Sequence, residues 1–138
     1  MKAAVAEATC CVVDCSNVGG RSLCRLDWSV EGHLSRAVIV LTTFPSDHDA
    51  DTLARTLVSE RLAACVNILP LMQSIYRWKD AVEQAAERQL IIKTEQSQLE
   101  SLKQRLTALH PYDVPEILVL AVADGGASYL RWISDSIG

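Results

Sequence analysis

The chain has 138 residues, of which 49% are hydrophobic and 22% are charged, a composition typical of one ordinary globular domain. Its formal net charge of -4 argues against a nucleic-acid partner, because binding a phosphate backbone requires clustered Lys and Arg. The sequence shows neither an apolar stretch long enough for a membrane span nor a cleavable signal, so we expect a cytoplasmic protein without a membrane partner.

Residues 1–36 differ from the rest of the chain. They contain four of the five cysteines and equal numbers of basic and acidic side chains, four of each, so all the net negative charge lies in 37–138. They show no sustained strand or helix period. We expect an N-terminal extension that is disordered or results from a wrongly assigned start codon. A zinc site is the alternative, although the cysteine spacing lacks the paired arms of a zinc knuckle.

A regular order of elements begins at residue 37. The apolar, β-prone run over residues 37–43 predicts a strand covered on both faces, which Pro45 ends. The apolar residues that follow have helical spacing and predict a helix over residues 47–63, which a Ser46–Asp49 capping pair begins.

A long hairpin is predicted next. Residues 65–69 and 73–78 form one long strand with a break at Pro70, because proline cannot donate to a sheet. The chain turns at Lys79-Asp80 and returns through residues 89–94, which gives the hairpin a polar tip.

The remaining elements complete one domain. Leucines at helical spacing predict a second helix over residues 96–109, and the proline-containing segment 110–115 predicts a stiff connection. Residues 117–123 predict a buried strand, and a short helix is expected over 129–137. The order β-α-β-β-α-β with a short C-terminal helix predicts an α+β, ferredoxin-like antiparallel sheet with helices on one face. We expect the first and last strands at its centre.

Several short motifs carry a resemblance to a known family. They are Thr42-Thr43-x-Pro45, Leu62-Ala63-Ala64-Cys65-Val66-Asn67, Ser74-Ile75-Tyr76-Arg77-Trp78, Lys93-Thr94, His110-Pro111-Tyr112-x-x-Pro115-Glu116-Ile117 and Tyr129-Leu130-x-Trp132-Ile133. In order and spacing they are similar to the CutA family over residues 37–138.

The resemblance implies a homotrimer similar in shape to the PII signalling proteins, with clefts between subunits. It also implies a role in tolerance of divalent metal ions, with copper(II) or another divalent cation as the bound metal and no obligatory cofactor. A PII-like small-ligand sensor or scaffold without a metal function is the alternative.

The candidate metal ligands are Cys65, His110 and Glu116, since thiolate, imidazole and carboxylate all bind copper or zinc. Two of them have a structural alternative: Cys65 as a small buried hydrophobe, and His110 as a polar side chain that fastens the bend. With so few ligands, any site is expected to be shared between subunits or open to water.

The candidate ligand-cleft residues are Tyr76, Trp78, Lys93 and Tyr112, in which lysine supplies charge for a small anion or metabolite and the rings supply an apolar wall. Trp78 as an anchor between subunits is the alternative. No nucleophile elbow, zinc-protease helix or phosphate-binding loop is present, so we expect no enzyme activity.

Overall fold

The computed structural model describes residues 15–18, 21–24 and 36–138, with side chains from residue 36 onward, and the chain divides into two units, Met1–Gly32 and His33–Gly138. In the first unit, β1 (Cys15–Val18) pairs antiparallel with β2 (Arg21–Cys24), two strands that the sequence did not predict. The rest of the expected extension lies outside the described residues. Whether that extension is disordered stays a prediction.

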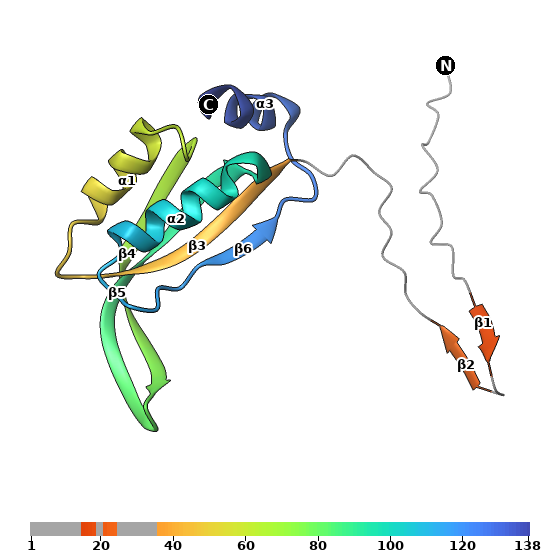
Figure 1. Cartoon of the computed structure of the whole chain (residues 1–138), viewed down its shortest axis with the longest axis horizontal. Helices are drawn as coiled ribbons and strands as arrows, with labels where there is room; N and C mark the ends of the chain where they lie inside the picture. Colours follow the sequence, from red (N-terminus) through yellow and green to blue (C-terminus); the bar gives the residue numbers. More distant parts are fainter. Residues whose placement is uncertain (1–14, 19–20, 25–35) are drawn as a thin grey trace, which may run out of the picture. The chain divides into compact units, whose positions relative to one another are not determined.

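The second unit is an α+β domain whose four-stranded sheet has the order β4-β5-β3-β6, with every pair antiparallel (Figure 1). The strands are β3 (Ala37–Pro45), β4 (Cys65–Trp78), β5 (Ala81–Glu95) and β6 (Leu118–Ala121). The predicted element order is confirmed. The predicted centre is wrong, because β5 pairs with both β3 and β4 and so shares the centre with β3, while β6 lies at an edge.

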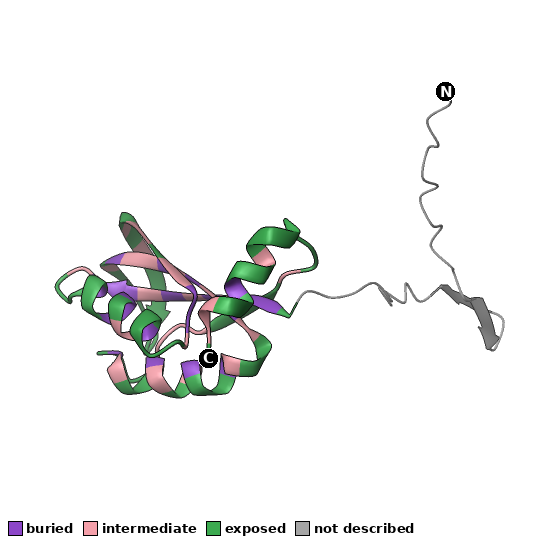
Figure 2. Ribbon diagram, turned by 90° about the horizontal axis from the view of Figure 1, so that it is seen from above, coloured by how far each residue is buried: buried purple, intermediate pink, exposed green. Residues whose placement is uncertain are grey.

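The helices α1 (Ala50–Ser59) and α2 (Leu99–Leu109) cover one face of this sheet (Figure 1). Alternate residues of β3 and β5 point to this face and are buried there with the inner sides of both helices (Figure 2). The completely buried core residues are Val40, Leu57, Ala63, Leu90, Ile92, Leu102 and Leu106. The segment η1 (Gln96–Gln98) precedes α2 as one turn of 3₁₀-helix. None of the helices in the described segments is long and apolar enough to cross a membrane.

The first helix is shorter than predicted at both ends. Asp49, and not Ser46, caps it, because its carboxylate accepts hydrogen bonds from the backbone N–H and the hydroxyl of Thr52, at 3.1 and 2.6 Å. The helix stops when Arg61 adopts φ 56°, so that Leu62 N–H bonds to Leu57 C=O. This is a Schellman motif with an arginine where glycine is usual, and it explains why the sequence did not mark the end.

The hairpin of β4 and β5 projects beyond the helices (Figure 1). Its register shifts between Ile68 and Leu71, which confirms an irregularity at Pro70 without a break in the strand. Lys79 and Asp80 both have positive φ, 44° and 67°, the geometry of a two-residue type I′ turn. That tight turn pairs Trp78 with Ala81, so β5 begins at Ala81 rather than at residue 89.

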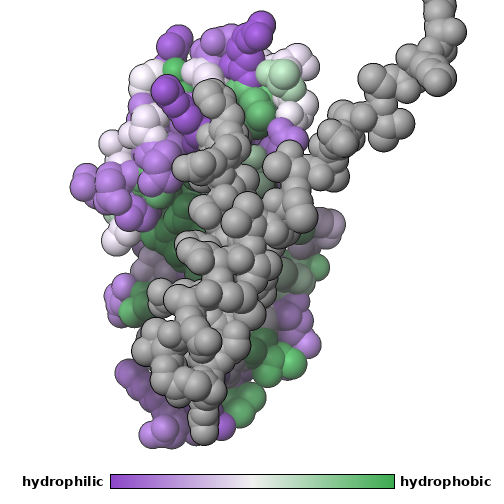
Figure 3. Space-filling view, turned by 90° about the vertical axis from the view of Figure 1, so that its right-hand side faces the viewer, coloured by the Kyte–Doolittle hydropathy of each residue, from purple (hydrophilic) through white to green (hydrophobic). Residues whose placement is uncertain are grey.

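The face of the sheet opposite α1 and α2, hereafter the open face, is covered only at one end. There α3 (Ala127–Ser136) buries Ile133 with Ala37 and Ala64. The edge strand β6 was predicted as buried, but all four of its residues are exposed, including Leu118 at 54% and Leu120 at 49%. An edge strand has neighbours on one side only, so apolar composition alone does not bury it. Viewed from the side where β6 and α3 lie, hydrophobic residues form patches on the visible surface (Figure 3).

Candidate functional site

A cavity of about 530 Å³ lies against the open face, between the outer half of the hairpin and the loop that joins α2 to β6. Its volume is within the usual range of small-molecule sites. Strands β3, β4 and β5 contribute Thr43, Ser74, Tyr76, Trp78, Glu83 and Glu87, and the loop contributes Pro111, Tyr112, Asp113, Val114 and Glu116.

The loop is held in place by His110, which is only 9% exposed. Its Nδ1 lies 3.1 Å from the backbone N–H of Tyr112 and its Nε2 lies 2.8 Å from the carbonyl oxygen of Thr43. An N–H can only donate and a carbonyl can only accept, so Nδ1 is the acceptor and Nε2 the donor in these two contacts. The edge of its ring also meets Phe44, with centroids 5.2 Å apart. Both ring nitrogens therefore serve to position the loop.

Tyr112 closes the cavity onto the sheet. Its hydroxyl donates to Glu87 Oε1 at 2.9 Å, and Glu87 is only 4% exposed. Burial, together with the hydrogen bond to Glu87 and the charge of that carboxylate, raises the pKa of Tyr112 to about 12. At neutral pH the phenol is therefore protonated and acts as a donor.

The charge lining the cavity has one sign. Four carboxylates line it, from Glu83, Glu87, Asp113 and Glu116, and no Lys, Arg or His is among the lining residues. Desolvation, followed by the negative charge of Glu83, raises the pKa of Tyr76, whose hydroxyl lies 3.4 Å from Glu83 Oε2. Glu116 Oε2 accepts a hydrogen bond from the side-chain amide of Gln89 at 3.2 Å. The cavity is thus negative, with aromatic walls.

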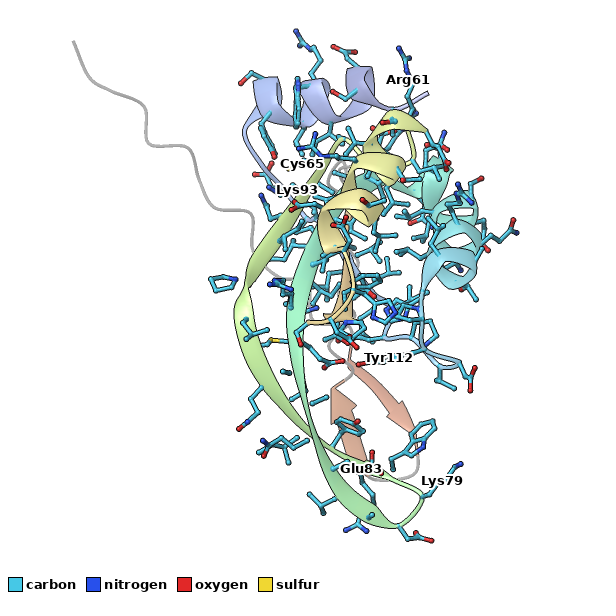
Figure 4. The ribbon with its side chains drawn as sticks, turned by 90° about the vertical axis from the view of Figure 1, so that its left-hand side faces the viewer. Arg61, Cys65, Lys79, Glu83, Lys93 and Tyr112 are labelled. Atoms are coloured by element: carbon cyan, nitrogen blue, oxygen red, sulfur yellow. The ribbon has the colours of Figure 1, made fainter. Side chains whose placement is uncertain are left out.

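Three of the four predicted cleft residues, Tyr76, Trp78 and Tyr112, line this cavity. Lys93 does not, because its position on β5 brings it to the other end of the sheet, beside Cys65 and far from Glu83 (Figure 4). Its Nζ lies 5.7 Å from the centroid of the Tyr129 ring and 3.9 Å from Cys65 Sγ. The anion-binding role expected from Lys93 therefore has no support in the cavity.

The structure does not gather Cys65, His110 and Glu116 into one site. Cys65 pairs with Lys93 on β5. His110 bonds to the carbonyl of Thr43 and Glu116 bonds to the side chain of Gln89. Thr43 and Gln89 pair with each other, and Gln89 lies four residues from Lys93 on β5. Among residues 36–138, no group of three or more His, Cys, Asp or Glu side chains could hold a metal ion. A metal role for these three residues stays a prediction, and it requires ligands from a second subunit or from water.

Of the four acidic residues of the cavity, Glu116 was predicted from the sequence as a metal ligand, and Glu83, Glu87 and Asp113 were missed. Glu83 and Glu87 belong to the part of β5 that was assigned to the hairpin tip, and only the strand register places them opposite Tyr76 and Met72. Residues 81–89 show no apolar–polar alternation, and their alanines and glutamates are poor β-formers, so no local signal marked this half of the strand.

The chain resembles known proteins over the second unit. The model of the CutA1 divalent ion tolerance protein family matches residues 38–136. The "Divalent-cation tolerance protein CutA" of Thermus thermophilus is 49% identical over 100 residues, which are 72% of this chain and 97% of that protein. "Protein CutA, chloroplastic" of Arabidopsis thaliana is 43% identical, over 72% of this chain and 55% of that protein.

Solved structures agree with the fold. CutA from Xylella fastidiosa superposes with a TM-score of 0.73 at 41% identity, and the match covers 75% of this chain and all of that one. The divalent cation tolerance protein from Thermus thermophilus gives a TM-score of 0.71 at 48% identity, over 74% of this chain and 99% of that chain.

Proposed function

The chain belongs to the CutA1 divalent ion tolerance family, and on this premise we propose that it acts in tolerance of divalent metal ions as a homotrimer with an open copper(II) site. The observation that carries the assembly is the unpaired apolar edge formed by β6. Such an edge pairs readily with another chain, and closed cyclic symmetry limits the assembly to a finite number of subunits. The number three comes from the family resemblance.

The proposed copper site is weak because a single chain supplies few ligands. Within residues 36–138 the accessible imidazole is that of His48, whose side chain is 47% exposed and whose Nδ1 contacts Asp47 at 2.9 Å. His110 would have to break two hydrogen bonds to bind a metal. His48 is therefore the residue whose replacement we expect to reduce copper(II) affinity most, with Cys65 as the second ligand candidate.

The experiment is a calorimetric titration of the full chain with copper(II) and zinc(II), after light scattering has established its mass. We expect the mass of three subunits and weak binding with copper(II) above zinc(II), following the usual affinity order. Binding should weaken at acid pH, because protons compete with the metal for its ligands. His48→Gln should reduce copper(II) affinity, and Cys65→Ser should reduce it less.

Two results would contradict this proposal. A mass of one subunit by light scattering would show that the protein is not a trimer. Copper(II) binding that survives in both variants but disappears on deletion of residues 1–35 would place the metal on the cysteines of the extension.

A second candidate function, a PII-like sensor of a small ligand, is favoured by the cavity itself. The cavity has a suitable volume, three aromatic walls and a loop held in place by a buried histidine, whereas no metal-binding group is found in the described part of the chain. On this alternative, ligand occupancy and not metal is the signal that the protein reports.

A further inference from the structure

The sign of the charge in the cavity restricts what it can bind. Four carboxylates face a space that no Lys, Arg or His of residues 36–138 lines. Three basic side chains lie next to lining residues in the sequence. Arg77 donates to the carbonyl of Asp80 at 3.2 Å, Arg88 donates to that of Ser46 at 3.3 Å, and Lys79, in the hairpin turn, is not among the lining residues. An anionic ligand such as a nucleotide would meet uncompensated repulsion.

Aromatic rings form the remaining walls. Tyr76 and Trp78 come from β4 and Tyr112 comes from the loop, so rings from separate elements surround the same space. Tyr76 and Trp78 are 40% and 44% exposed near the end of the projecting hairpin, so both rings are accessible to a ligand. The faces of such rings carry negative potential and attract organic cations, as in sites for quaternary ammonium groups.

Glu87 supplies an oriented counter-charge. It is 96% buried, and the Tyr112 hydroxyl holds one of its carboxylate oxygens at 2.9 Å. A carboxylate so poorly solvated is expensive to bury unless a positive group approaches it. Its position on a paired strand, and its bond to a loop fastened by His110, fix it in place before any ligand arrives.

We infer that the cavity binds a small organic cation, a protonated amine or a quaternary ammonium compound, between the rings of Tyr76, Trp78 and Tyr112 and the carboxylate of Glu87. The inference rests on the second candidate function, since it names the ligand class of that sensor. It differs from a metal site, because the cavity surrounds a ligand with aromatic carbon, which does not coordinate a divalent ion.

The test is a calorimetric titration of the full chain at low ionic strength with three probes. They are choline, its uncharged analogue with a quaternary carbon in place of the nitrogen, and ATP. We expect choline to bind at least about tenfold more tightly than the uncharged analogue, because only choline gains the attraction of the rings and the carboxylate. ATP should not bind.

Variants locate the binding. Glu87→Gln keeps an acceptor for the Tyr112 hydroxyl but removes the charge, so choline affinity should fall about tenfold while that of the uncharged analogue stays unchanged. Glu100→Gln removes the same charge from an exposed position on α2 and should leave both unchanged. Trp78→Leu removes one ring at an exposed position and should weaken choline binding several-fold, which keeps the test valid if Glu87→Gln does not fold.

The outcomes distinguish failure of the cation inference from failure of the sensor function. Equal binding of choline and its analogue, or binding of ATP alone, overturns the cation inference and leaves a ligand-binding cavity. The absence of binding by any probe overturns both the inference and the sensor function. Choline binding that neither Glu87→Gln nor Trp78→Leu changes places the cation elsewhere and also overturns the inference.

Discussion

At the scale of single residues, the pair formed by Tyr112 and Glu87 joins the loop to the sheet and sets the electrostatics of the cavity. The bond is 2.9 Å long, and it couples a phenol to a carboxylate that has little access to water. Because burial and the carboxylate both disfavour the phenolate, the folded protein holds the phenolic proton more tightly than the unfolded chain does.

This pair predicts an alkaline dependence of stability. The pKa of Tyr112 is raised from 10.0 to about 12 on folding, so its stabilising contribution is fully present below pH 10 and is lost as the pH rises from 10 to about 12. We expect Tyr112→Phe to lower the free energy of unfolding by about 1 kcal/mol at neutral pH, the value of one hydrogen bond. The difference from the parent chain should shrink as the pH rises through that window.

Two measurements test this prediction: chemical denaturation at several pH values, and absorbance titration of the folded protein, which should show a late tyrosine step near pH 12. Tyr76, whose pKa is also raised, should titrate in Tyr112→Phe as it does in the parent chain. Tyr112→Phe should abolish the late step. Tyr129→Phe removes a hydroxyl on α3, outside the cavity, and serves as the control that should keep it. A late step that persists in Tyr112→Phe would show that the assignment to Tyr112 is wrong.

At the scale of elements, the end of α1 is set by backbone geometry rather than by a breaking residue. Arg61 adopts φ 56°, and two backbone bonds, Arg61 N–H to Val58 C=O and Leu62 N–H to Leu57 C=O, close the motif. Left-handed geometry is unfavourable for a residue that has a Cβ, so the motif exists because burying Leu62 against the core outweighs that cost.

We therefore expect Arg61→Gly to stabilise the protein by about 0.5–1 kcal/mol, because glycine adopts this geometry without steric cost. The same substitution at Arg55, exposed in the middle of α1, is the matched control and should destabilise by about 1 kcal/mol. Urea denaturation of both variants measures the two effects. A loss of stability in Arg61→Gly as large as that in Arg55→Gly would mean that the side chain of Arg61 contributes more than its backbone strain costs.

At the scale of the whole molecule, the second unit contains every element of the family fold and its own core. Among the described residues, the first contact is made at Arg36, whose carbonyl accepts a hydrogen bond from Gln96 N–H at 2.9 Å. Ala37 and Val38, next along the chain, are buried at 3% and 5% exposure. We therefore expect the autonomous part to need no residue before Arg36.

A chain that begins at Arg36 is expected to fold, to assemble into the same number of subunits and to melt at the same temperature as the full chain. A chain that begins at Ile39 is the control, because it lacks two buried residues of β3 and their pairing with β5 and β6. It should melt at a clearly lower temperature. Calorimetry and light scattering on the three chains measure this, and a chain from Arg36 that loses its cooperative transition would make the extension part of the core.

Local patterns in the sequence determined most of the elements. Apolar periodicity located β3 and α2, the Lys79-Asp80 pair located the turn, and Pro70 marked the irregularity in β4. The family motifs also identified the correct relatives. These features are local because each depends on residues adjacent along the chain or one helical turn apart.

Only the tertiary structure decided the site and the order of the sheet. Glu87 and Tyr112 are 25 residues apart in the sequence, and their contact depends on the register of the hairpin and on the loop that His110 fastens. Lys93 is on the same strand as Glu87, yet six positions along an extended strand of roughly 3.3 Å per residue carry it to the opposite end of the sheet. The charge of the cavity depends on which residues line it. Pairing between segments that are far apart in the sequence brings those residues together, and the periodicity of the sequence does not encode that pairing.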